Sequence, residues 1–200
     1  VVDEDVTELN DMVLSGQIFD NHDNAIVVKN ITKQYNNSVT ALSQVNLYVK
    51  VGEVFGVLGA NGAGKSTLMS VITGRTNPSE GEIYLFDQLM SQSGSSNEIE
   101  KYVSICPQFD NHLFPCLTPR QHFILYGMLK YFYTNDETSI DNIDDLTTII
   151  SEYEQLMELQ PHKDKLVREL SGGNQRKLSI ALAFLGNPRI VFLDEPTASL

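Results

Sequence analysis

A glycine-rich segment carries the residue types that bind phosphate. It reads Gly59, Ala60, Asn61, Gly62, Ala63, Gly64, Lys65, Ser66 and Thr67, which fits the pattern G-x-x-x-x-G-K-[ST]. Glycines let backbone N–H groups wrap phosphate oxygens, and a helix that begins there adds a favourable field. We expect Lys65 to reach the β- and γ-phosphates, Ser66 to ligate Mg²⁺ and Thr67 to contact the α-phosphate side. The alternative is a glycine-rich turn with no chemical role.

The elements on either side of this loop favour the phosphate-binding interpretation. The apolar run Val54–Leu58 predicts a buried strand that leads into the loop. After the loop, Leu68, Val71 and Ile72 recur at helical spacing until Gly74. A strand, a glycine loop and a helix in this order are the context that the motif requires.

Two acids follow a second apolar run near the end of the chain. Ile190–Leu193 predicts a buried strand, and Asp194 and Glu195 come directly after it. We expect Asp194 to hold Mg²⁺ through water and Glu195 to polarise an attacking water. The alternative is that Glu195 only caps the strand. Whether it acts as a full general base or only positions the water is left open.

Ser171-Gly172-Gly173 precedes a predicted helix and offers a second anion site. The apolar face of that helix contains Leu178, Ala181, Leu182 and Leu185. In isolation, Ser-Gly-Gly is typical of a plain helix N-cap. The serine hydroxyl, the glycine N–H groups and the helix dipole together can also bind an anion.

The remaining pattern predicts an α/β chain with a helical insertion. Residues 1–24 form an acidic lead-in or linker with a weak helical pattern, and strands are expected at 26–35, 45–49, 82–86 and 102–106. Thr118-Pro119 begins a helix, 134–145 is a polar loop, and an amphipathic helix over 149–159 ends at Pro161. The core therefore comprises 25–108 and 187–200, and the helical subdomain 109–186.

The composition limits the classes of protein to which this chain can belong. The 200 residues are 42% hydrophobic, enough for one domain with a core. Since no apolar stretch reaches about 18 residues and no secretory pattern begins the chain, we expect a soluble domain. The net charge of −12 makes nucleic acid an unfavourable partner.

The cysteines and histidines do not predict a metal or redox site. Cys106 and Cys116 are ten residues apart, fit no zinc or redox spacing, and are expected to be buried reduced thiols. The four histidines are scattered without i, i+4 pairing, at positions 22, 112, 122 and 162.

The order and spacing of the phosphate loop, the Ser-Gly-Gly step and the acidic strand resemble the ATP-binding cassette (ABC) family from about Ala25 onward. The resemblance implies an α/β fold: a P-loop NTPase (RecA-like) core with N-terminal antiparallel β strands and an inserted α-helical subdomain. Cys106–Asp110 and Leu170–Ser179 look most like the A subfamily, mostly lipid exporters. Asn174 departs from the commoner family glutamine but is similar to that subfamily's pattern.

The resemblance also implies roles for individual residues. Gln108 matches the family's glutamine loop, with Mg²⁺ contact and coupling as its roles, and joins Lys65 and Glu195 in the expected catalytic group. Tyr35 stands where the family places an aromatic side chain that stacks on adenine, a contact worth about 1–3 kcal/mol. The alternatives are an ordinary loop amide for Gln108 and a packing tyrosine on a strand for Tyr35.

The implied cofactors are ATP and Mg²⁺, and the implied partners are of two kinds. Ser171-Gly172-Gly173 would face the γ-phosphate bound by a second nucleotide-binding domain, so that ATP is sandwiched in a head-to-tail pair. Transmembrane domains of a parent transporter would be the other partner. The domain would then lie at the cytoplasmic face of a membrane.

The end of the chain affects what activity is expected. Leu200 comes just before the aspartate of the family's D-loop, and the next strand and its switch histidine are not present. The sequence therefore predicts a C-terminally truncated fragment, nearly complete for ATP binding and poorly active in turnover. Two alternatives stay open: a soluble ABC-family ATPase acting on ribosomes or chromosomes, and a non-catalytic nucleotide-binding module.

Overall fold

The structure is a computed structural model that describes residues 4–16, 18, 23–35, 39–90, 103–132 and 143–197. The chain divides into two compact units, Val1–Ile99 and Glu100–Leu200, and each is described by itself. This division falls nine residues before the boundary predicted at residue 108. The strand that ends at Cys106 belongs to the same unit as the helices. The predicted core-and-insertion scheme remains a proposal.

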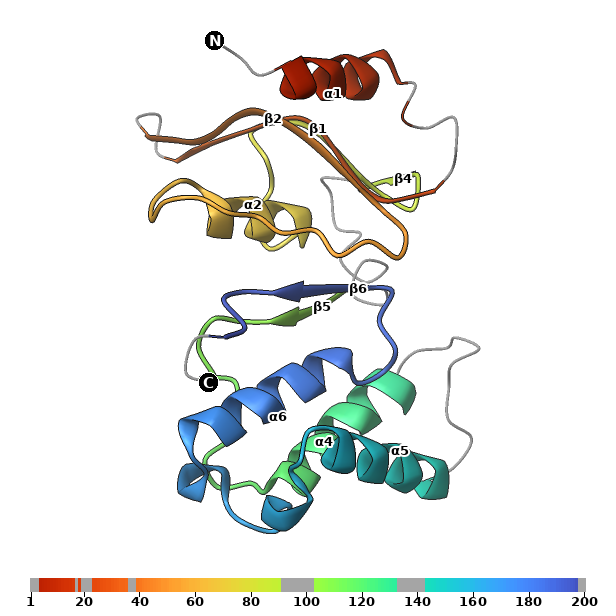
Figure 1. The fold of residues 1–200 in the computed structure, drawn as a ribbon, viewed down its shortest axis with the longest axis vertical. Coiled ribbons are helices and arrows are strands. Elements are labelled where there is room, and N and C mark those ends of the chain that lie inside the picture. Colours follow the sequence, from red (N-terminus) through yellow and green to blue (C-terminus); the bar gives the residue numbers. More distant parts are fainter. Residues whose placement is uncertain are drawn as a thin grey trace. The chain divides into compact units, whose positions relative to one another are not determined.

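An antiparallel sheet forms the centre of the first unit, with strand order β2-β1-β3-β4 (Figure 1). The strands are β1 (Asn24–Tyr35), β2 (Val39–Lys50), β3 (Glu80–Leu85) and β4 (Gln88–Leu89). Val28 pairs with Leu47 of β2 on one side and with Ile83 of β3 on the other. Val27, Val28 and Ile31 are buried, because β1 lies between two strands. The predicted N-terminal antiparallel strands are confirmed.

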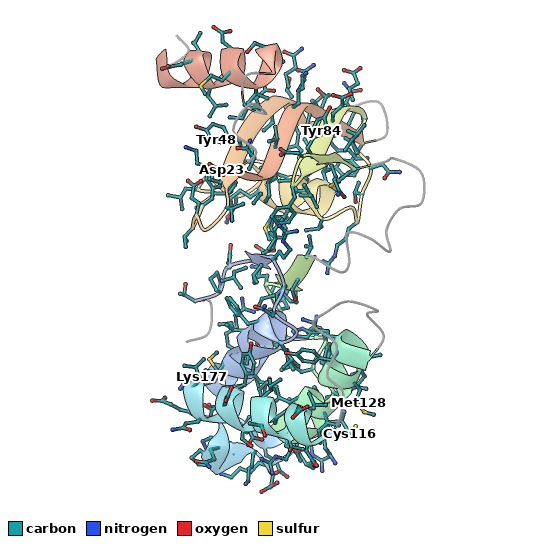
Figure 2. The ribbon with its side chains drawn as sticks, turned by 90° about the vertical axis from the view of Figure 1, so that its right-hand side faces the viewer. Asp23, Tyr48, Tyr84, Cys116, Met128 and Lys177 are labelled. Atoms are coloured by element: carbon teal, nitrogen blue, oxygen red, sulfur yellow. The ribbon has the colours of Figure 1, made fainter. Side chains whose placement is uncertain are left out.

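Helix α1 (Glu4–Ser15) packs on this sheet, within the segment that the sequence predicted as an acidic lead-in or linker with a weak helical pattern. Val13 is fully buried beside Ile18 and Val27. Leu9, Met12 and the tyrosines Tyr48 and Tyr84, which Figure 2 labels, pack around that cluster. The helix is stable here because Leu9, Met12 and Val13 follow one another at i, i+3 and i+4, which forms an apolar stripe facing the sheet.

Helix α2 (Lys65–Ile72) lies on the opposite face of the sheet from α1 (Figure 1). It buries Leu68, Val71 and Ile72, as its spacing predicted.

The predicted buried strand at Val54–Leu58 is wrong for the described unit. These residues form no strand, and Val54 and Leu58 are 99% and 96% exposed. A strand is buried only when neighbouring strands accept and donate its hydrogen bonds. The described sheet of this unit consists of β1, β2, β3 and β4, and none of these strands pairs with this run.

Within its described residues, the second unit contains two parallel strands and three α-helices. The strands are β5 (Val103–Cys106) and β6 (Ile190–Leu193), with Cys106 opposite Leu193. The helices are α4 (Pro119–Gly127), α5 (Ile143–Leu156) and α6 (Gly172–Phe184), joined by the shorter turns η2 (Met128–Phe132), η3 (Gln160–His162) and η4 (Val167–Glu169). Apolar side chains from all three helices form one core, including Phe123, Leu146, Ile150, Leu178 and Leu185.

Helix α4 begins where its sequence signals predict, whereas α5 begins and ends earlier than predicted. Thr118 caps α4 with a full capping box, in which its side chain and that of Gln121 bond to each other's backbone. Helix α5 begins at Ile143, earlier than predicted, because Asp144 and Asp145 suit the first turn of a helix. It ends at Leu156, and Pro161 lies in η3. Most of the predicted polar loop, 134–142, lies outside the described residues.

A half-buried lysine joins the turn η2 to α6 and β5. The ammonium of Lys130 donates to the carbonyls of Leu182 and Leu185 at 3.0 and 2.8 Å, and to Ser104 Oγ at 3.0 Å. A cation at the C-terminal end of a helix is favourable. Burial lowers the pKa of Lys130 to about 8.

The two cysteines differ in environment. Cys106 is fully buried, but Cys116, labelled in Figure 2, is exposed, so the expectation of two buried thiols is wrong for Cys116. It lies on the short turn that precedes α4, where the backbone passes over the surface. Among the described helices, none combines the length and apolar character needed to cross a membrane.

Candidate nucleotide site

The predicted phosphate loop curls around its own lysine. Lys65 Nζ donates to the carbonyl oxygens of Gly59 and Ala60 at 2.7 and 3.0 Å, and Ala63 N donates to the Ala60 carbonyl at 3.1 Å. Gly59 to Ala63 are exposed. An ammonium held at the start of helix α2, inside an exposed loop, is a strong attractor for an anion.

Gly64 has a backbone conformation and surroundings that only glycine accommodates. It forms the N-cap of α2 with φ of 95°, in the left-handed region. A Cβ atom added there would lie 2.5 Å from the carbonyl oxygen of Ala41. The loop that leads into α2 therefore lies directly against β2 at this point. Both this close contact and the backbone conformation of the loop require glycine at position 64.

We predict that Gly64→Ala lowers the free energy of unfolding by about 1–3 kcal/mol, because it combines an unfavourable φ with a contact to backbone that cannot move aside. Gly56→Ala is the control. Gly56 has no atom within 4 Å of its added Cβ, so its stability should change by less than about 0.5 kcal/mol. Urea denaturation followed by circular dichroism measures both. Equal midpoints for the two variants would contradict the argument.

The carboxyl ends of β5 and β6 bring three predicted site residues together. Asp194 N donates to the Cys106 carbonyl at 3.0 Å, which extends the pairing of the two strands. Gln108 Nε2 then donates to Glu195 Oε2 at 3.1 Å. Glu195 has φ of 45°, which is uncommon for a residue with a side chain and recurs at functional sites.

Ser171 is the N-cap of α6, and its Oγ accepts a hydrogen bond from Asn174 N at 3.3 Å. Ser171 and Gly172 are exposed, and no atom lies within 4 Å of a Cβ added to Gly172. This arrangement fits the plain cap that the sequence left open. It also fits an anion site, because the N-terminus of α6 is exposed at Ser171 and Gly172.

Tyr35 ends β1 and is 40% exposed, so its ring is accessible. Lys33 Nζ lies 5.2 Å from the centre of that ring, within the range of a cation–π contact, and donates to the Asn77 carbonyl at 2.7 Å. The contribution of Lys33 was not predicted from the sequence.

A second residue that sequence reasoning missed is Arg176. Its side chain is fully buried in α6 and contacts the loops that follow β5 and β6. The sequence did carry one signal for it. Arg176, Ser179 and Ala183 are spaced so that they lie on one face of α6, and all three are buried.

A buried polar group lies on the same face of α6. Ser179 Oγ is 3.4 Å from Cys106 Sγ and 3.1 Å from His112 Nε2. Burial lowers the pKa of His112, and the neighbouring Asp110 carboxylate opposes that shift. We assign this group a packing role between β5 and α6.

The predicted site residues thus fall into two groups, one in each compact unit. Tyr35 and Gly59 to Thr67 belong to Val1–Ile99, while Gln108, Ser171 to Gly173, Asp194 and Glu195 belong to Glu100–Leu200. The chemistry of the donors suits MgATP. The loop has a glycine cradle and a cation, and the predicted metal ligands Ser66, Gln108 and Asp194 offer the hard oxygen atoms that Mg²⁺ prefers.

Comparison with known proteins gives one consistent result. Residues 42–198 match the family model described as ABC transporter. The chain is 36% identical over 186 residues to the cholesterol transporter ABCA5 of Rattus norvegicus, a match that covers 88% of this chain and 11% of that protein. It is 32% identical over 200 residues to the phospholipid-transporting ATPase ABCA3 of Rattus norvegicus, covering 99% of this chain and 11% of that protein. The chain thus spans about a tenth of the length of these relatives.

Solved structures agree on the fold. The structure of cbiO1 from Clostridium perfringens, part of the ABC transporter complex cbiONQ, matches with a TM-score of 0.75 at 27% identity, covering 89% of this chain and 68% of that chain. The ATP-binding cassette MJ0796, solved as a dimer bound to ADP and Pi, matches with a TM-score of 0.73 at 28% identity, covering 88% and 75%. The predicted α/β P-loop NTPase fold is confirmed.

Proposed function

We propose that this chain, which belongs to the ABC transporter family, binds MgATP and, paired with a second such domain, hydrolyses it to drive export by a membrane transporter. The observation that carries this proposal is the exposed loop wrapped around Lys65, with Gly64 fixed at the start of α2. Relatives described as cholesterol and phospholipid transporters support lipid as the transported class.

Binding would exchange contacts that the loop already makes. Lys65 would give up its two carbonyl partners and donate to the β- and γ-phosphate oxygens, while the loop N–H groups surround them. The exposed ring of Tyr35 would stack on adenine, with Lys33 Nζ in cation–π range of the same ring. Mg²⁺ held by Ser66, Gln108 and Asp194 would neutralise charge on the phosphates when it is bound.

Hydrolysis would depend on the two acids after β6. A water oxygen attacks the γ-phosphorus, the bond to the bridging oxygen breaks, and ADP and phosphate leave. Glu195 orients that water and accepts or directs its proton. The Gln108 amide, which donates to Glu195, would hold the carboxylate in place until nucleotide binds.

Pairing would use the exposed N-terminus of α6. Ser171, Gly172 and Gly173 would donate to the γ-phosphate bound by a second domain, so that ATP joins the two head to tail. Dimeric cassette structures support this arrangement. Transmembrane domains would be the other partner, and the domain would work at the cytoplasmic face of a membrane.

The transporter part of the proposal has a simple test. The complete polypeptide that carries this chain should contain membrane-spanning helices, or assemble with subunits that do. A polypeptide that lacks them, purified from cells without membrane subunits, would instead support a soluble family member that acts on ribosomes or chromosomes.

Replacing Lys65 by Ala should weaken MgATP binding by at least about tenfold, because it removes charge-assisted hydrogen bonds to two phosphates, each worth about 1.5–3 kcal/mol. Lys50→Ala is the matched control: it removes the same charge from an exposed position on β2. Titration calorimetry on the intact protein measures both affinities. If Lys65→Ala binds MgATP as tightly as Lys50→Ala, the loop is only a turn and the assignment fails.

A further inference from the structure

Arg176 lies in the second turn of α6, and its side chain is fully buried. Its guanidinium donates on three sides. Nε donates to the Pro196 carbonyl at 3.0 Å, and Nη2 donates to the Asp194 and Glu195 carbonyls at 2.8 and 3.0 Å. On the remaining side, Nη1 donates to the carbonyls of Pro107 and Gln108 and to Asp110 Oδ1, at 2.6, 3.3 and 3.2 Å.

These contacts occupy every N–H of the guanidinium. The side chain has five N–H groups and six acceptors within range, and five of the acceptors are backbone carbonyls. Asp110 is the only carboxylate among them. A buried charge is costly, and one carboxylate 3.2 Å away offsets only part of that cost. Lysine could not replace this fork, since its three donors come from one nitrogen.

The neighbouring residue shows that this arrangement is specific to one position. Lys177, labelled in Figure 2, lies on the outer side of α6, where its ammonium is 2.6 Å from the exposed Glu158 carboxylate. An exposed pair of that kind contributes little to stability. The two basic residues are adjacent in sequence, but only Arg176 reaches the loops after β5 and β6.

Both loops that Arg176 holds carry expected catalytic groups. The loop after β5 contains Gln108, and the loop after β6 contains Asp194 and Glu195. Glu195 has a left-handed backbone, and such a conformation persists only when surrounding contacts fix it. The hydrogen bond from Nη2 to the Glu195 carbonyl is one of those contacts.

We infer that Arg176 is a positioning residue for ATP hydrolysis: its guanidinium ties the loop after β5 to the loop after β6, so that Gln108 and Glu195 meet at one water. The inference rests on the proposed function of that site. Arg176 acts through Glu195 and touches no substrate. Its loss should therefore misplace the carboxylate while the phosphate loop continues to bind ATP.

The test compares Arg176→Met and Arg176→Lys with the control Lys177→Met in the intact protein. Steady-state phosphate release gives kcat and KM, and calorimetry gives MgATP affinity, at a temperature where circular dichroism shows each variant to be folded. Arg176→Met should lower kcat by about 10–100-fold with KM and affinity within about threefold of the parent. Arg176→Lys should restore only part of the loss, and Lys177→Met should behave as the parent. A parallel fall in folded fraction and kcat, with the specific activity of folded protein unchanged, would overturn the inference.

A second comparison separates this inference from the proposed function. If Arg176 acts through Glu195, then adding Arg176→Met to Glu195→Gln should lower the residual rate by less than about threefold, because the positioned group is already lost. A further loss as large as that in the parent would overturn the inference while leaving hydrolysis at this site intact. If Glu195→Gln alone does not lower the rate of hydrolysis, the proposed site itself is refuted.

Asp110→Asn keeps the experiment decisive if the Arg176 variants do not fold. It removes only the charge that faces Nη1 and leaves the side-chain volume unchanged. It should lower kcat several-fold with KM unchanged. If Asp110→Asn has the kcat of the parent, the clamp does not position the site.

Discussion

Replacing Glu195 by Gln should lower ATP hydrolysis by about 10²–10⁴-fold, the usual contribution of a positioned base. MgATP affinity should remain close to that of the parent, because Lys65, Ser66 and Asp194 are unchanged. The substitution nearly preserves the size of the side chain, so Gln108 and Arg176 keep their backbone surroundings. Phosphate release at saturating MgATP, with affinity from calorimetry, measures the two effects separately.

Glu152→Gln provides the control for the change in charge. Glu152 is exposed on α5 and lies among residues with no expected role in hydrolysis. Its replacement should leave both rate and affinity unchanged. A loss of less than about tenfold in Glu195→Gln would mean that Glu195 only ends β6, the alternative that its sequence context left open.

Signals carried by neighbouring residues account for the parts of the structure that the sequence predicted well. Thr118, Pro119 and Gln121 specify the start of α4 within four residues, and the capping box forms as that spacing requires. Ser171 likewise fixes the first residue of α6. The phosphate loop belongs to the same class, because its glycines and lysine are adjacent and its geometry depends on the helix that follows.

Predictions that depended on distant partners were less successful. Val54–Leu58 has the composition of a buried strand, but burial requires a neighbouring strand, and composition does not say which one is available. For helix α1 the sequence showed only a weak helical pattern within an acidic lead-in or linker. The helix is stabilised because its apolar stripe packs on the sheet surface around Val27. In both cases the structure of the segment depends on its contacts with another segment of the chain.

Arg176 shows the same limit for the candidate site. A sequence shows a basic residue after Ser-Gly-Gly, but not whether its side chain is exposed to solvent or is buried against six hydrogen-bond acceptors. Lys177, one position later, meets the exposed Glu158. The difference arises from the rotation of α6 against β5 and β6, which tertiary packing determines. Sequence reasoning could therefore name Gln108, Asp194 and Glu195 from their place after strands, but not the residue that holds their loops together.

Ser171 offers the sharpest test of whether ATP joins two domains, because one substitution separates its two possible roles. Aspartate is as good a helix N-cap as serine, so Ser171→Asp should keep the bond to Asn174 N and the start of α6. It places a negative charge where the γ-phosphate of a paired domain would bind. In a plain cap this change is neutral, whereas in an anion site it is strongly unfavourable.

In the cassette domain that carries this chain, prepared without membrane-spanning segments, Glu195→Gln should trap ATP and produce dimers on size exclusion with light scattering. Adding Ser171→Asp should abolish these ATP-dependent dimers, and adding Ser171→Arg should do the same by filling the site. MgATP binding to the monomer should remain close to that of the parent, because the phosphate loop is untouched. Ser151→Arg, an exposed change on α5, should leave the dimers intact. Dimers that persist in Ser171→Asp would show that Ser-Gly-Gly is a helix cap alone, and the paired arrangement would lose its basis.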